Sequence, residues 1–252
     1  MAALSILSFV SGCVFGSIGA LFVTNRPNMN SLSRFSRCDY CAADLRKRFT
    51  IPVISYIFLS GQCKNCRRKI PPIYIVMELS CGGLWTLCSF MYKTDPFTPT
   101  AWALCTVCLM AAAYDYKTGR VPDSLHLFLL MIGAVWCAAV VMTGRNPVLY
   151  NLIGFFAVSA PLLLISVLTK GGIGGADIKF TAVCGLILGW RLIILALFLG
   201  IVLAAAVMLP LRIMGKIKPR QQIPILPFLS VGVMVSMFWG NLLLIRYTGI
   251  FI

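Results

Sequence analysis

Long apolar runs alternate with short polar segments along the 252-residue chain, and most of the runs have about 20 residues. This is the length that a helix needs to cross about 30 Å of hydrocarbon. The pattern predicts an all-α polytopic membrane protein with about eight transmembrane helices. We expect them at 4–24, 73–92, 99–115, 124–143, 149–168, 178–190, 192–210 and 225–245. The sixth and seventh are short and are separated only by Gly189, Trp190 and Arg191.

Composition agrees with this class. The chain is 60% hydrophobic and 12% charged, against about 25% charged in soluble domains. The first apolar run is preceded by no Lys or Arg, and no small-residue cleavage site follows it. It is therefore expected to be a retained first span and not a secretory signal peptide.

The distribution of basic residues predicts the orientation in the membrane. Of the 22 Lys and Arg residues, 18 lie on one side of the eight-helix topology, in 25–72, 115–123, 169–179 and 211–224. Because cytoplasmic loops are enriched in Lys and Arg, these segments are expected in the cytoplasm and the N-terminus outside. The net charge of +15 then reflects topology and attraction to anionic lipid headgroups, and nucleic-acid binding is disfavoured.

Four cysteines in the polar segment 25–72 have the spacing of a zinc site. They form two C-x2-C pairs, CDYC at 38–41 and CKNC at 63–66. Two such turns can complete a tetrahedron of thiolates, and four thiolates leave no position for a catalytic water. Cys38, Cys41, Cys63 and Cys66 are therefore predicted to bind a structural Zn²⁺ that folds a small cytoplasmic segment.

Of the seven acidic residues, Asp115 and Asp177 are the candidates for acid–base catalysis. Both are expected at the same cytoplasmic depth, where two carboxylates can share a proton, one acting as acid and the other as base. An ordinary helix N-cap is the alternative for Asp177, and an interfacial turn residue is the alternative for Asp115. Asp123 is expected to cap the fourth span.

The glycine-rich stretch GGIGGA at 171–176 precedes Asp177. Its glycines permit positive φ and close backbone approach, so extended substrate backbone can lie near the carboxylate. Lys179 is interpreted as an interfacial anchor or a charge partner and not as a nucleophile. The single histidine, His126, and the lack of H-E-x-x-H, G-x-S-x-G and Walker A motifs leave the paired aspartates as the hydrolytic groups.

Several motifs, in order, resemble the type IV prepilin peptidases, which are membrane aspartyl proteases of pilus, type II secretion and competence systems. The matching stretches are GSIGALFVTNRP (16–27), IPVISYIFLSGQC (51–63) between the cysteine pairs, YIVMEL (74–79), AAAYDYKTGRVPD (111–123), GGADIK (174–179), GW (189–190) and IPILPF (223–228). The family has a glycine directly before its second aspartate, where this chain has Ala176.

This resemblance implies a function. Asp115 and Asp177 would be the catalytic pair, with Gly174, Gly175, Ala176 and Lys179 in the substrate loop. The substrates would be prepilins or pseudopilins, whose short basic leader is removed at the cytoplasmic face. Many members also methylate the new N-terminus with S-adenosylmethionine, and on that analogy Glu78 and segment 25–72 are candidates for methyl transfer or substrate positioning.

The domain organisation expected is a first span (1–24), the zinc-binding and methyltransferase region (25–72) and the peptidase domain (73–252). A proton-coupled transporter that uses Asp115 and Asp177 as a relay is an alternative from another class, as is a zinc-containing scaffold for an assembly platform. The sequence does not indicate an oligomeric state.

Overall fold

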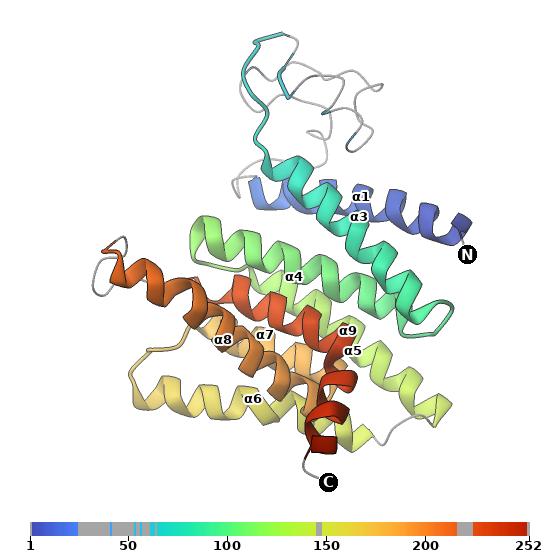
Figure 1. The fold of residues 1–252 in the computed structure, drawn as a ribbon, viewed down its shortest axis with the longest axis vertical. Coiled ribbons are helices and arrows are strands. Elements are labelled where there is room, and N and C mark those ends of the chain that lie inside the picture. The colour runs from blue at the N-terminus through green and yellow to red at the C-terminus, as the bar shows by residue number, and fades with distance from the viewer. Residues whose placement is uncertain are drawn as a thin grey trace. The chain divides into compact units, whose positions relative to one another are not determined.

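The computed structural model describes residues 2–24, 41, 53, 56, 61–63, 65–144, 148–215 and 224–250. Within these ranges the structure is helical apart from turns and one isolated bridge between Gln62 and Lys69. The helices, labelled in Figure 1, are α1 (Ala2–Thr24), α3 (Ile73–Tyr92), α4 (Thr98–Thr118), α5 (Asp123–Thr143), α6 (Val148–Leu168), α7 (Gly175–Leu188), α8 (Trp190–Ile213) and α9 (Leu226–Ile250).

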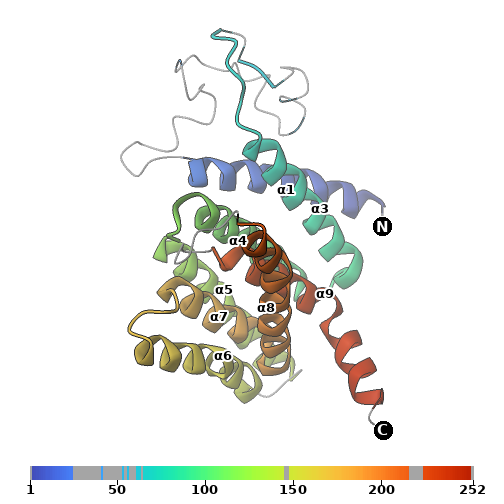
Figure 2. The same cartoon turned by 60° about the vertical axis from the view of Figure 1, so that its left-hand side comes forward.

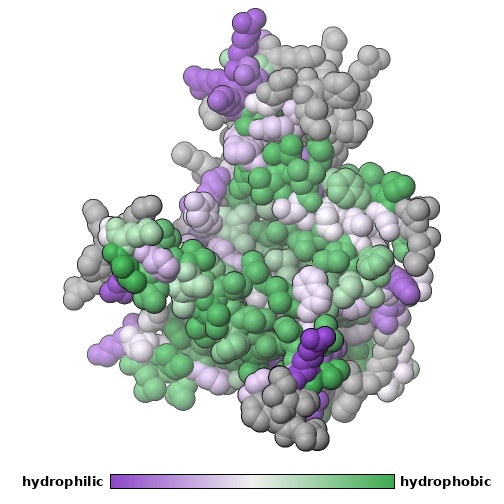
Figure 3. Space-filling model, viewed as in Figure 1, coloured by the Kyte–Doolittle hydropathy of each residue, from purple (hydrophilic) through white to green (hydrophobic). Residues whose placement is uncertain are grey.

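Six of these helices are long and apolar enough to cross a membrane, namely α1, α3, α5, α6, α8 and α9. Large apolar side chains are exposed on them, such as Val135 and Phe198, and the face drawn in Figure 3 is largely hydrophobic. The protein is therefore a multi-pass membrane protein. The sequence predicts eight spans, but α4 and α7 are not among the six. With 14 residues, α7 is about 21 Å long, shorter than the hydrocarbon core.

The chain forms two compact units, Met1–Thr106 and Val107–Ile252. In the first unit, α1 packs on α3 through glycines. A Cβ at Gly16 would lie 2.5 Å from the Met77 carbonyl oxygen, and one at Gly82 would lie 2.6 Å from the Cys13 sulfur. Since lipid provides no hydrophobic drive between helices, such small residues allow the close approach that holds the pair together.

Aromatic rings join α3 to the first half of α4. The Trp85 and Trp102 rings stack with centroids 4.8 Å apart and an interplanar angle of 4°. Trp85 Nε1 donates to the Thr106 hydroxyl at 3.0 Å, and Trp102 Nε1 donates to the Trp85 carbonyl oxygen at 3.1 Å. Both indole N–H groups thus have partners, as buried tryptophans usually require.

In the second unit, α7 contacts α5, α6, α8 and α9 and lies among them (Figure 2). Every residue from Phe180 to Leu188 is buried, so this helix is the core of the unit. Its backbone meets that of α6 where Gly185 faces Gly154. At its C-terminus, Gly189 at φ 81° breaks the helix before α8 begins.

The break leaves the last carbonyls of α7 without helical donors. Asn151 Nδ2 donates to the Leu186 carbonyl oxygen at 2.9 Å, and the Cys137 sulfur lies 3.8 Å from the same oxygen. Polar side chains from α6 and α5 therefore satisfy the end of α7. The opposite end of α7 carries Asp177 and Lys179.

Candidate active site

Asp177 is the third residue of α7. The helix begins at Gly175, and its N-cap is Gly174, with no side-chain cap hydrogen bond. The alternative that Asp177 is an ordinary N-cap is therefore wrong. The expected start of this helix at residue 178 is also wrong, because the helix already begins at Gly175. Its first turn is polar, so hydropathy does not reveal it.

Asp115 lies in the last turn of α4, three residues before Thr118, and so is not a turn residue. Its Oδ2 accepts a hydrogen bond of 3.1 Å from the backbone N–H of Leu226, the first residue of α9. Asp115 thus satisfies one of the unpaired donors at the start of another helix. No local sequence pattern indicates this role, because the two residues are 111 positions apart.

The two carboxylates influence each other electrostatically, and both lie outside the six candidate spans. Burial raises the pKa of Asp177 to about 6, and the negative charge of Asp115 adds to this rise. Burial also raises the pKa of Asp115, and the Leu226 N–H opposes that rise. A carboxyl group whose pKa is raised toward neutrality can act as an acid near neutral pH, as acid–base catalysis by two carboxylates requires.

Removing the charge of Asp115 is therefore expected to lower the pKa of Asp177 below about 6. In Asp115→Asn the amide oxygen still accepts from Leu226, so the geometry stays while the repulsion is lost. Infrared titration of the protonated carboxyl band, identified by its absence in Asp177→Asn, measures this shift. An unchanged titration midpoint in Asp115→Asn contradicts the coupling.

The glycine-rich stretch is less strained than expected. Only Gly171 among its glycines has positive φ, at 96°, with Lys170 before it at 52°. A Cβ at Gly174 would lie 3.1 Å from Asp177 Oδ2, whereas one at Gly175 would meet nothing within 4 Å. Open space therefore lies beside the first turn of α7 at Gly175, while the Asp177 carboxylate lies against Gly174.

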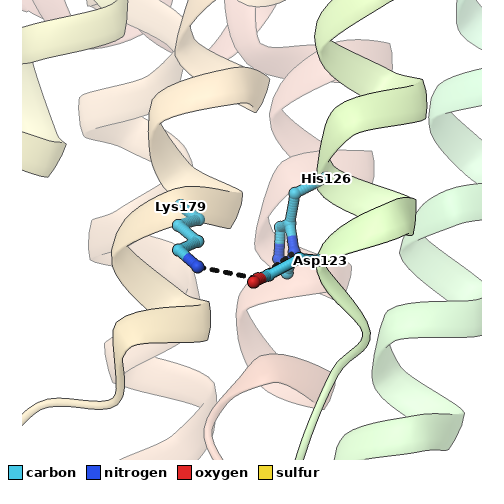
Figure 4. Close-up of polar contacts among 3 residues, drawn as sticks. All are labelled: Asp123, His126 and Lys179. Atoms are coloured by element: carbon cyan, nitrogen blue, oxygen red, sulfur yellow. Dashed lines mark hydrogen bonds and ion pairs between the residues drawn. The ribbon is translucent and has the colours of Figure 1, made fainter.

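Lys179 is paired with an acid on α5. Its Nζ donates to Asp123 Oδ1 at 2.7 Å, as Figure 4 shows. The interpretation of Lys179 as a charge partner is confirmed. Asp123, however, is the first residue of α5 and makes no side-chain cap, so its expected capping role is wrong. His126 is buried next to it, with Nδ1 4.0 Å from Asp123 Oδ1.

In the first unit, three of the four predicted zinc ligands lie together. The sulfurs of Cys41, Cys63 and Cys66 are all within 4.8 Å of one another, and Cys38 lies outside the described residues. The Cys41 and Cys63 sulfurs are 3.9 Å apart. Tetrahedral zinc with bonds of about 2.3 Å would place two sulfurs about 3.8 Å apart, so this donor set fits the ion.

The turn that carries Cys63 and Cys66 is held by its own backbone. Cys63 N–H donates to the Arg68 carbonyl oxygen at 3.0 Å, and Arg67 N–H donates to the Cys63 carbonyl oxygen at 2.8 Å. The bridge between Gln62 and Lys69 closes this turn. The spacing of two residues between the thiols thus places both sulfurs on one side of a short loop.

Glu78 is buried on α3, with 5% of its surface exposed. Its Oε2 accepts a hydrogen bond of 2.7 Å from the Val53 N–H, and the Ser17 hydroxyl also donates to the carboxylate. This hydrogen bond ties Val53 to α3. Glu78 belongs to the same unit as the cysteine cluster, while Asp115 and Asp177 belong to the other.

Family models match two stretches of the chain. The Bacterial Peptidase A24 N-terminal domain matches residues 10–92, and the Type IV leader peptidase family matches residues 102–209. No solved structure matches the chain.

Curated relatives agree with these matches. A prepilin leader peptidase/N-methyltransferase of Burkholderia pseudomallei (strain 1026b) is 32% identical over 211 residues, which are 82% of this chain and 67% of the relative. One of Bacillus subtilis (strain 168) is 26% identical over 245 residues, 97% of either chain, and one of Dichelobacter nodosus is 29% identical over 226 residues. The resemblance drawn from the motifs is confirmed, and the chain belongs to the type IV leader peptidase family, a family of membrane proteases.

Proposed function

We propose that this protein is an aspartyl endopeptidase that removes the short basic leader of type IV prepilins or pseudopilins at the cytoplasmic face of the membrane, with Asp115 and Asp177 as its catalytic pair. The observation that carries the proposal is the placement of two partly buried carboxylates in one compact unit, with Asp115 bonded to the start of α9 and Asp177 in the first turn of α7, which contacts α9. The names of the relatives, prepilin leader peptidases, support the substrate class.

The environments of the two aspartates favour different roles. The Leu226 N–H and the N-terminal end of α9 favour negative charge on Asp115. Burial and the charge of Asp115 raise the pKa of Asp177 to about 6, whereas the Leu226 N–H opposes the rise in the pKa of Asp115. Asp115 is therefore the base and Asp177 the acid at the start of the reaction.

The reaction follows from these roles. Asp115 takes a proton from water as the water oxygen forms a bond to the scissile carbonyl carbon. The C–N bond then breaks, and Asp177 gives its proton to the departing amine. The products are the leader carboxylate and the new N-terminal amine, and the proton taken by Asp115 remains on the pair. Gly175, where an added Cβ would meet nothing within 4 Å, leaves room for an extended substrate backbone at the first turn of α7.

N-methylation of the new terminus is the proposed second activity, and S-adenosylmethionine would supply the methyl group. The names of the relatives include this activity, and Glu78 with segment 25–72 is its candidate region. Glu78 would hold or orient the amine or a neighbouring substrate group, because its carboxylate is already fixed by two donors.

A single experiment tests both activities. Purified protein in detergent is incubated with a prepilin and S-adenosylmethionine, and the N-terminus of the product is read by mass spectrometry. A new terminus directly before the hydrophobic segment supports cleavage, and a mass increase of one methyl group supports transfer. An intact prepilin under conditions where the protein stays folded contradicts the proposed function.

The structural zinc has a separate prediction. Cys63→Ser is expected to lower bound zinc from about one ion per chain to near zero, because three ligands remain and a thiolate is lost. Metal analysis of purified protein measures this, with Cys137→Ser as the control, since Cys137 lies on α5 and is not one of the clustered cysteines. Full zinc content in Cys63→Ser would overturn the assignment of that ligand.

The orientation remains part of the proposal. The excess of Lys and Arg supports a topology in which the cysteine cluster and both aspartates are cytoplasmic and the N-terminus is outside. No comparison supports the alternative of a proton-coupled transporter. The expected partners are prepilins or pseudopilins and membrane lipid, and no nucleic acid is expected.

A further inference from the structure

The ion pair between Lys179 and Asp123 joins the first turns of two helices. Asp123 is the first residue of α5, and Lys179 follows Asp177 by two residues on α7. Figure 4 shows the lysine reaching across the gap between the helices to the carboxylate. The ion pair therefore links α5 to the first turn of α7, which carries the proposed acid Asp177.

Exposure of the pair argues against a large role in folding. The side chains of Lys179 and Asp123 are 54% and 75% exposed. Exposed ion pairs contribute little to stability, because solvent screens them and ordering two side chains is costly. We therefore expect the 2.7 Å contact between Lys179 and Asp123 to affect mainly the orientation of the first turn of α7.

The helical period determines that geometry. Residues two apart in an α-helix point about 200° apart around the axis. Lys179 and Asp177 therefore leave α7 on nearly opposite sides, and a tether at Lys179 turns Asp177 away from α5. Without the tether, the glycines at 174 and 175 would restrain the rotation of this turn only weakly.

His126 lies next to the ion pair between Lys179 and Asp123, with its Nδ1 4.0 Å from Asp123 Oδ1. Its ring is buried beside the backbone carbonyls of Pro122 and Ala176, and neither ring nitrogen has a hydrogen-bond partner among the described residues. The ring of this α5 residue thus lies against the backbone of the first turn of α7 at Ala176. Asp123 and Lys179 make the specific polar contact between them.

We propose that Lys179 and Asp123 are positioning residues, which set the rotation of the first turn of α7 so that Asp177 faces Asp115. This inference rests on the proposed peptidase function. It assigns Asp123 a role that differs from helix capping, and it assigns Lys179 a partner within the chain in place of a contact to substrate.

Charge removal and charge exchange test the proposal. Lys179→Gln and Asp123→Asn are each expected to lower kcat of prepilin cleavage about 10- to 100-fold with KM nearly unchanged, because a misplaced catalytic group slows chemistry more than binding. The double variant Lys179→Asp with Asp123→Lys restores the pair in reverse and should recover kcat to within about fivefold of wild type. Lys170→Gln removes a positive charge from the same segment and is the matched control.

The outcomes separate the explanations. Normal kcat in either single variant, or no recovery in the exchanged double variant, overturns the positioning role. A rise in KM at constant kcat means instead that Asp123 or Lys179 binds the leader. Thermal unfolding in detergent, expected to be unchanged, excludes misfolding as the cause. Cleavage by Asp115→Asn or Asp177→Asn would refute the proposed function itself, and these variants leave the ion pair intact.

Discussion

Replacing Asp177 with asparagine is expected to reduce prepilin cleavage by about a thousandfold or more, because the amide cannot give a proton to the departing amine. Asp115→Asn should have a similar effect, since an amide cannot take a proton from water. Both substitutions preserve size, and the amide oxygen at 115 still accepts from the Leu226 N–H. Cleavage rates of purified variants with a prepilin substrate measure the loss.

Asp95→Asn is the matched control for these two variants. Asp95 Oδ1 accepts from the Phe97 N–H in a loop of the other unit, and an asparagine oxygen can do the same. This variant should cleave at the wild-type rate. If Asp115→Asn or Asp177→Asn also cleaves at that rate, the substituted residue has no catalytic role.

A leucine at Gly82 is expected to destabilise the first unit strongly, by about 2–3 kcal/mol. Its Cβ would lie 2.6 Å from the Cys13 sulfur and 3.0 Å from the Phe9 carbonyl oxygen, so α1 must move away from α3. The backbone of α1 cannot yield as a flexible side chain would. Thermal unfolding in detergent measures the loss of stability.

The adjacent glycine provides the control. A Cβ at Gly83 would meet nothing within 4 Å, so Gly83→Leu has the same change in helix propensity without the collision. It should leave stability within about 0.5 kcal/mol of wild type or raise it. Equal losses in Gly82→Leu and Gly83→Leu would mean that helix propensity, and not packing on α1, determines the effect.

Much of the helical architecture follows from hydropathy. The range 73–92 coincides with α3, and the expected bounds of α5 and α6 lie within one residue of those in the structure. The start of α7 was misplaced because Gly175, Ala176 and Asp177 add no apolar signal, although a helix commonly begins with a polar turn. Whether α4 and α7 cross the membrane stays a prediction.

The candidate site could be predicted only in part. Local spacing was sufficient for the cysteines, because a C-x2-C pair brings two sulfurs together on one turn. The contact between Asp115 and Leu226 joins residues 111 positions apart and depends on how α4 meets α9. The pairing of Asp123 with Lys179 likewise depends on how α5 packs on α7. No local pattern reports such distant packing.

The short helix α7 has a consequence for how the protein is made. A segment of 14 residues with two charged side chains, Asp177 and Lys179, in its first turns is not expected to insert into a bilayer on its own, because charged groups are costly there. Its last carbonyls also need Asn151, which is already present on α6 when α7 is synthesised. We therefore expect α7 to enter the membrane as part of a hairpin with α8, docking against α6. Biogenesis of the second unit is then cooperative, and the proposed acid Asp177 reaches its place only when the surrounding helices are assembled.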